Sequence, residues 1–200
     1  MVLNVVATIL GGAPPSSGDT NDEVAEYFVD KADSLKVAAL LGGLSLIALS
    51  WWFGSLWRRM SKAENGNHRL SVVALIGFTG SGALFAASQA PVSAIAFRVD
   101  ELSPDAIRLF WVLSTVLLSM AAFFITVHLA AVNALALRTG MLPKWATIVG
   151  LVSAVAFLFG GFGVMTDADA ILLFGFIGFI MWSVWLVATS VHMWRTADAA

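Results

Sequence analysis

Residues 35–59, LKVAALLGGLSLIALSWWFGSLWRR, decide the fold class of this chain. The first 23 of these residues carry one charged side chain, Lys36 at the start, and the stretch ends at Arg58 and Arg59. A helix rises about 1.5 Å per residue, so about 20 apolar residues cross the hydrocarbon core of a bilayer. The stretch therefore predicts a transmembrane helix that reaches the membrane surface at the two arginines.

Four further runs of the same kind follow along the chain. The five runs lie at about 35–57, 71–93, 107–131, 145–165 and 170–193. The whole chain is 59% hydrophobic and 12% charged, whereas charged residues make up about 25% of soluble domains. Short loops between the runs favour antiparallel neighbours. The sequence thus predicts an all-α membrane protein, built as a compact bundle of five transmembrane helices.

Three segments divide the chain. Residues 1–21 predict a flexible tail, in which the apolar part Val2–Ala13 is too short to span and lacks the basic start of a secretory signal. An interfacial segment and a truncated signal or span are the alternatives for it. Residues 22–34 predict an acidic amphipathic stalk helix, with Val24, Phe28 and Leu35 on one face. Residues 35–200 form the five-helix transmembrane domain.

The charges between the runs predict the orientation of the bundle. Seven Lys and Arg residues lie in the first gap, the third gap and the C-terminal flank, and four lie in the other three flanks. Of the 13 Asp and Glu residues, two lie in the first set of flanks and eleven lie in the second set. Loops rich in Lys and Arg stay in the cytoplasm. We therefore expect the N-terminus outside and the C-terminus in the cytoplasm, in a cell membrane, with the bacterial inner (plasma) membrane favoured.

Missing residue types exclude several functions. No Asp, Glu, Lys or Arg lies in the middle of a run, and such residues mark proton relays and ion-coupled transport. The chain has no cysteine and no basic stripe that would bind nucleic acid. We see no nucleophile with a base, no phosphate loop and no metal-ligand spacing. The sequence accordingly predicts that the protein is not an enzyme and needs no cofactor.

Two histidines give the one cofactor hypothesis. His128 and His192 lie on different predicted helices, towards their cytoplasmic ends, and two such imidazoles can ligate haem axially. Buried or interfacial hydrogen-bonded imidazoles are the simpler reading. At 1.5 Å per residue their expected depths differ by roughly 10 Å, which counts against haem.

Tryptophans and glycines mark other positions of interest. Trp51, Trp52, Trp182 and Trp185 lie deep in the first and last runs, where they could line a pocket for a lipid tail or a quinone. Ordinary packing is the alternative. Glycines gather in three of the runs, and we expect them to let helices approach closely; they are Gly77, Gly80, Gly82, Gly160, Gly161, Gly163, Gly175 and Gly178.

The connection 138–145, RTGMLPKW, carries a resemblance. It is similar to the TG-x-LP-[RK]-W connection between two late spans in a family of uncharacterised small multi-pass membrane proteins of actinobacteria. The basic first loop, from Leu56 to Ser71, resembles theirs as well. The likeness covers about residues 25–165. It implies the multi-pass fold and carries no activity.

These observations leave three functions open. The first expectation is a non-catalytic accessory or scaffold subunit, whose partners are the lipid bilayer and other membrane subunits or further copies of this chain. The second is a protein that binds or transports an apolar or neutral solute such as a lipid or quinone. The third is a haem-binding redox protein. An accessory subunit should present a lateral apolar face, and a solute binder should have a cavity beside the tryptophans.

Overall fold

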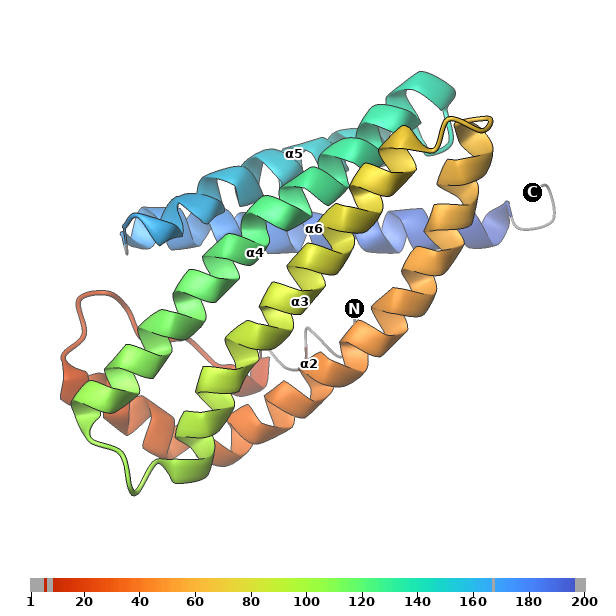
Figure 1. Cartoon of the computed structure of the whole chain (residues 1–200). Helices are drawn as coiled ribbons and strands as arrows, with labels where there is room; N and C mark the ends of the chain where they lie inside the picture. Colours follow the sequence, from red (N-terminus) through yellow and green to blue (C-terminus); the bar gives the residue numbers. More distant parts are fainter. Residues whose placement is uncertain (1–5, 7–8, 167, 197–200) are drawn as a thin grey trace.

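The computed structural model describes residue 6 and residues 9–166 and 168–196, and it contains the five predicted membrane helices (Figure 1). These helices are α2 (Asn21–Ala63), α3 (Arg69–Arg98), α4 (Pro104–Thr139), α5 (Lys144–Gly160) and α6 (Asp169–Arg195). A short 3-10 turn, η1 (Gly161–Val164), continues α5. The prediction of an all-α, multi-pass membrane protein is therefore confirmed.

Local sequence signals fix the start of α2 and both ends of α4. Thr20 caps α2 and forms a reciprocal capping box with Glu23. The Ser103 hydroxyl accepts a hydrogen bond from the Ala106 N–H, ahead of Pro104 in the first turn of α4. Gly140 ends α4 with a φ of 70°, a left-handed conformation that glycine adopts without strain.

The helices form an open ring. α3 packs against α2 and α4, α2 also packs against α4, α4 packs against α5, and α5 packs against α6. α2 and α6 are not packed along their lengths in the described part of the chain, and they meet through a few side chains. The bundle is therefore incomplete between its first and last helices.

Most of the predicted glycines sit where helices approach closely; at Gly82 and Gly175 a Cβ atom would meet no tight contact. A Cβ atom at Gly77 of α3 would lie 2.5 Å from the His128 backbone nitrogen of α4. A Cβ atom at Gly160 would lie 2.9 Å from the Gly175 Cα, across the α5–α6 contact. Such close backbone approach provides the packing that holds membrane helices together.

The acidic stalk segment is docked onto the bundle. Residues 22–34 are the first part of α2, and α2 at 43 residues is about 64 Å long, well over the thickness of a bilayer. Val24 and Phe28 are fully buried and cluster with Ile95 and Ile107 from α3 and α4. The predicted apolar face of this segment thus packs against two neighbouring helices, and the segment does not project as a free stalk.

Part of the N-terminal tail also packs against this end. The Tyr27 hydroxyl donates a 2.8 Å hydrogen bond to the Gly11 carbonyl. The Arg108 guanidinium donates to the carbonyls of Ser17, at 3.1 Å, and Asp19, at 3.2 Å. The predicted flexible tail therefore has fixed contacts from Gly11 onward. Residues 1–5 and 7–8 lie outside the described part.

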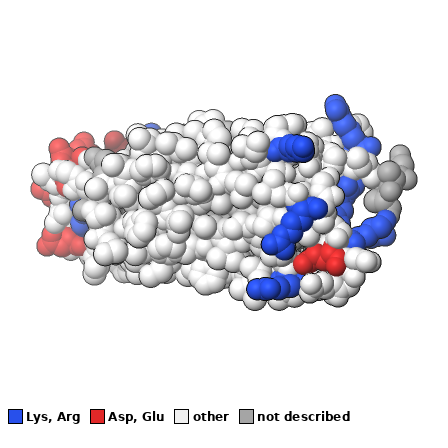
Figure 2. Space-filling model, turned by 90° about the horizontal axis from the view of Figure 1, so that it is seen from above, with Lys and Arg blue, Asp and Glu red and all other residues white. Residues whose placement is uncertain are grey.

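Charged side chains gather at the two ends of the bundle, and the face seen in Figure 2 is free of Lys, Arg, Asp and Glu between these ends. The acidic end is formed by the start of α2, the α3–α4 connection and the α5–α6 connection. The basic end is formed by the α2–α3 and α4–α5 connections and the end of α6. Its Lys and Arg residues are Arg58, Arg59, Lys62, Arg69, Arg138, Lys144 and Arg195.

Candidate functional site

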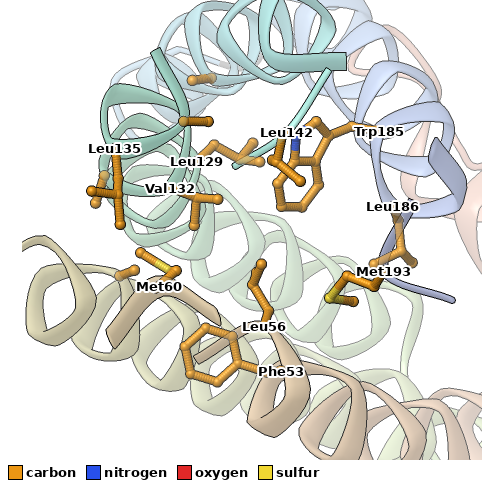
Figure 3. Close-up of a cluster of buried hydrophobic side chains, with 14 of the residues drawn as sticks. Phe53, Leu56, Met60, Leu129, Val132, Leu135, Leu142, Trp185, Leu186 and Met193 are labelled. Atoms are coloured by element: carbon orange, nitrogen blue, oxygen red, sulfur yellow. The ribbon is translucent and has the colours of Figure 1, made fainter. Parts of the chain in front are cut away.

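Side chains from α2, α4 and α6 converge in the half of the bundle nearer the basic end (Figure 3). Phe53, Leu56 and Met60 come from α2, and Trp185 comes from α6. Trp185 is fully buried, and it is the largest of the fully buried side chains. This cluster lies partly within the predicted membrane spans and partly just beyond them towards the basic end, and it forms the wall behind the site described below.

His128 belongs to this wall. Its imidazole is 1% exposed, and its Nδ1 lies 3.0 Å from the Ala74 carbonyl oxygen of α3. The rings of Phe53, Phe78 and Trp185 surround it, with centroids 5.4, 5.5 and 6.0 Å away. His128 therefore joins α3 and α4 from within an aromatic enclosure.

The haem hypothesis does not fit this arrangement. The three aromatic rings occupy the space beside the His128 imidazole that a porphyrin would need. His128 lies level with Trp185, and His192 follows Trp185 by seven residues, which is about 10 Å along α6. Two axial ligands of one iron must lie much closer in depth.

Asn133 and Trp185 form a buried polar pair. The Trp185 Nε1–H donates a 3.1 Å hydrogen bond to the Asn133 Oδ1, and the Asn133 amide donates at 2.8 Å to the Leu129 carbonyl. Gly150 of α5 provides the space, because a Cβ atom there would lie 2.6 Å from the Trp185 Nε1. Three helices thus fix the orientation of the Trp185 indole.

The four tryptophans predicted to share a pocket have four different surroundings. Trp185 is buried, and Trp182 is half-buried against the core cluster. Trp51 is 81% exposed and faces away from the bundle. Trp52 is half-buried, and its Nε1–H donates a 2.9 Å hydrogen bond to the Ser190 hydroxyl of α6. Trp52 and Trp185 bring the first and last helices into contact, with ring centroids 5.8 Å apart.

A groove lies where the ring of helices stays open. Its volume is about 270 Å³, and it opens to the surroundings of the bundle between α2 and α6. The lining residues are Ala48, Leu49 and Trp52 of α2 and Leu186, Val187, Ser190 and Val191 of α6. We call it the α2–α6 groove. Its lining is almost wholly apolar, and the polar atoms at Trp52 and Ser190 bond to each other.

An arginine joins the two helices at the basic end. The Arg59 guanidinium donates to the Met193 carbonyl and to the Thr196 hydroxyl, both at 2.6 Å. These acceptors lie at the C-terminus of α6, where backbone carbonyls lack helical partners and carry partial negative charge. Arg59 therefore stabilises the end of α6 and bounds the groove on that side.

Sequence reasoning missed three of these residues. In the sequence, Asn133 and Ser190 are ordinary polar residues within apolar runs, and Arg59 is one of several basic residues at a helix end. Only the spacing of Arg59 could have singled it out. Arg59 follows Trp52 by seven residues, which places both side chains on one face of the helix.

Comparison with known proteins identifies the family without a function. No curated protein and no solved structure matches the chain. One protein family, described as a domain of unknown function, matches residues 17–189. The match begins in the tail segment that Arg108 holds and ends at Thr189, in the last helix. It takes in the core cluster except Met193 and five of the seven residues that line the groove. Because the match covers most of the chain, the chain belongs to the family DUF4386, a domain of unknown function.

Proposed function

We propose that this protein binds one apolar chain from the bilayer in the α2–α6 groove. The observation that carries the proposal is the gap in the helix ring, which leaves a groove of about 270 Å³ open along the membrane-facing side. A hydrocarbon chain can enter such a groove sideways without leaving an apolar environment. This favours the lipid-binding alternative predicted from the sequence, with Trp52 as the tryptophan that contacts the chain.

The wall of the groove suits a binding role. Trp52 is held by Ser190, and it contacts Trp185, which is held by Asn133. Aromatic rings whose orientation is already fixed bind at a lower cost in conformational entropy. The buried part of the wall thus supports a shape that exists before the chain arrives.

Orientation and cell location form part of the same proposal. The separation of acidic and basic ends in Figure 2 is the pattern that the positive-inside rule uses. With the basic end in the cytoplasm, the C-terminus is cytoplasmic and the membrane is a bacterial plasma membrane. A reporter fused after Ala200 should then behave as cytoplasmic, and an external signal would reverse the orientation. That the protein is not an enzyme stays a prediction.

Photocrosslinking tests chain binding directly. Phosphatidylcholine carrying a diazirine in one acyl chain would be reconstituted with the full-length protein and irradiated. We expect crosslinks on peptides containing Trp52 or Val187, and we expect Ala48→Trp, which fills the groove, to abolish them. Ala130→Trp adds the same bulk at an exposed position of α4 and should change nothing. Crosslinks spread evenly over all five helices would contradict the proposal.

A second candidate is the accessory or scaffold role. The observation in its favour is that α6 packs mainly on α5 and exposes a row of large apolar side chains, among them Leu173, Phe176, Ile180 and Val184. Affinity purification from native membranes in mild detergent, read by intact-complex mass spectrometry, separates the candidates. A stoichiometric protein partner supports the accessory role, and a lone protein that retains a lipid mass supports binding.

A further inference from the structure

We infer that the chain in the α2–α6 groove belongs to an anionic phospholipid whose phosphate is bound by Arg59 and Lys62. This inference rests on the proposed function and names the class of ligand. It depends on what lies along the groove towards the basic end.

The face of α2 that lines the groove changes character along its length. Ala48 and Trp52 line the apolar part, and Arg59 follows Trp52 by two helical turns, about 10 Å further towards the basic end. Lys62 follows Arg59 by three residues and is exposed. A chain lying against Trp52 and running along this face therefore reaches two cationic side chains at the end of the membrane span.

α6 provides the matching side. Trp194 follows the groove residue Val187 by seven residues, on the same face. It is 79% exposed, and tryptophan is favoured at the level of lipid head groups. The order along the groove is thus apolar lining, interfacial aromatic ring and cation, which is the order of chain, glycerol region and phosphate in a phospholipid.

Arg59 can bind a phosphate while it holds α6. Its hydrogen bonds to Met193 and Thr196 involve two of the five N–H donors of a guanidinium. The side chain is half-exposed. Arginine recognises phosphate through paired hydrogen bonds as well as charge.

The surrounding charge favours a lipid with net negative charge. The basic end carries seven Lys and Arg residues, and Glu64 is the acid among the described residues of that end. Clusters of basic residues at the membrane surface attract anionic lipids. A zwitterionic head group adds a cation that this end would repel.

Head-group competition tests the inference. The full-length protein in detergent micelles would be offered phosphatidylglycerol and phosphatidylcholine with identical chains, and native mass spectrometry would read which lipid is retained. We expect phosphatidylglycerol to be retained about tenfold more than phosphatidylcholine. Glycerol phosphate without chains should not compete, which separates a lipid site from a free-phosphate site.

Matched variants locate the phosphate contact. Arg59→Gln and Lys62→Gln should each lower the preference for phosphatidylglycerol several-fold and leave phosphatidylcholine retention unchanged. Arg138→Gln removes a charge from the same end but on α4, which does not line the groove, and it should have no effect. Because Arg59 also holds α6, Lys62→Gln carries the test if Arg59→Gln fails to fold.

Each other outcome decides against one of the two proposals. Equal retention of both lipids, with both lost in Ala48→Trp, leaves chain binding intact and overturns the phosphate site. Equal losses in Arg138→Gln and Lys62→Gln overturn it too, since the end would then act as a diffuse charge. No effect of Ala48→Trp on either lipid overturns groove binding itself.

Discussion

Trp52 and Ser190 join the first and last membrane helices across the open side of the bundle. The Trp52 Nε1–H donates at 2.9 Å to the Ser190 hydroxyl, which itself donates at 2.6 Å to the Leu186 carbonyl one turn back. The indole is thereby held between α2 and α6 beside Trp185. A helix pair that lacks backbone packing depends strongly on such side-chain contacts.

We expect a double-mutant cycle on Trp52→Phe and Ser190→Ala to give a coupling free energy of about 0.6–1.7 kcal/mol, as hydrogen bonds between membrane helices usually do. Unfolding in mixed detergent micelles measures it. Ser50→Ala is the control, because the Ser50 hydroxyl bonds within its own helix, to Leu46. A coupling near zero would mean that the bond contributes no stability between α2 and α6.

Replacing Asn133 with Leu should destabilise the protein by about 1–3 kcal/mol, because the buried Trp185 N–H loses its acceptor. The same unfolding measurement applies. Thr115→Val is the control, because it also replaces a polar side chain with an apolar one. Thr115 is half-exposed, and its hydroxyl donates a hydrogen bond within its own helix, to the Val112 carbonyl. Equal free-energy changes in the two variants would show that the Asn133–Trp185 pair contributes no stability.

Gly150→Ala should lower the free energy of unfolding by about 1–3 kcal/mol, the usual range for overpacking. The new methyl group would overlap the Trp185 ring and the Asn133 amide. Gly43→Ala on α2 is the control, since no atom lies within 4 Å of a Cβ there. We expect that control to be neutral or slightly stabilising. A tolerated alanine at position 150 would mean that α5 shifts easily away from α4 and α6.

The hydrogen bonds around Glu64 predict that the stability of the protein depends on pH. Partial burial raises the pKa of Glu64, but hydrogen bonds from the Ser71 hydroxyl and from the backbone N–H groups of Leu70 and Ser71 together hold the pKa below its ordinary value of 4.5. The ionised carboxylate caps α3, because the side chain of the N-cap residue His68 makes no capping hydrogen bond. Its stabilisation is therefore present above pH 4.5 and lost as the pH falls through the lowered pKa.

Stability measured between pH 3 and pH 6 checks this dependence. Glu64→Gln should lower stability at neutral pH by about 0.5–2 kcal/mol, the range for a helix cap, and should flatten the acid limb of the curve. Glu26→Gln, at an exposed position of α2, is the control. An acid limb unchanged in Glu64→Gln would assign the pH dependence to other carboxylates.

Arg108→Gln should release the N-terminal segment, because its guanidinium holds the Ser17 and Asp19 carbonyls. We expect the rate of limited proteolysis between Gly12 and Asn21 to rise about tenfold. This corresponds to a fall of about 1.4 kcal/mol in the free energy needed to release the segment. Arg98→Gln removes a charge at the same end that pairs locally with Glu101. Equal cleavage rates in the two variants would show that the segment is held by other contacts.

The functional predictions were harder to make than the prediction of the fold, because they depended on contacts between helices. Trp51 and Trp52 are neighbours in sequence, yet one faces outward and the other lines the groove. Hydrophobicity is high all around these helices, so it does not tell which face is buried. The haem hypothesis depended on such contacts as well, since the depth of His128 follows from its packing against Trp185.

By itself, the sequence determined the five membrane helices, their ends and the separation of charge. These follow from the length of an apolar run, from Thr20, Ser103 and Gly140 as caps, and from charges that cannot enter hydrocarbon. Tertiary structure alone decided that α2 and α6 leave a groove, that Arg59 bounds it, and that the acidic segment is docked. In a bilayer every apolar face is tolerated, so only the fit between side chains selects which helices touch.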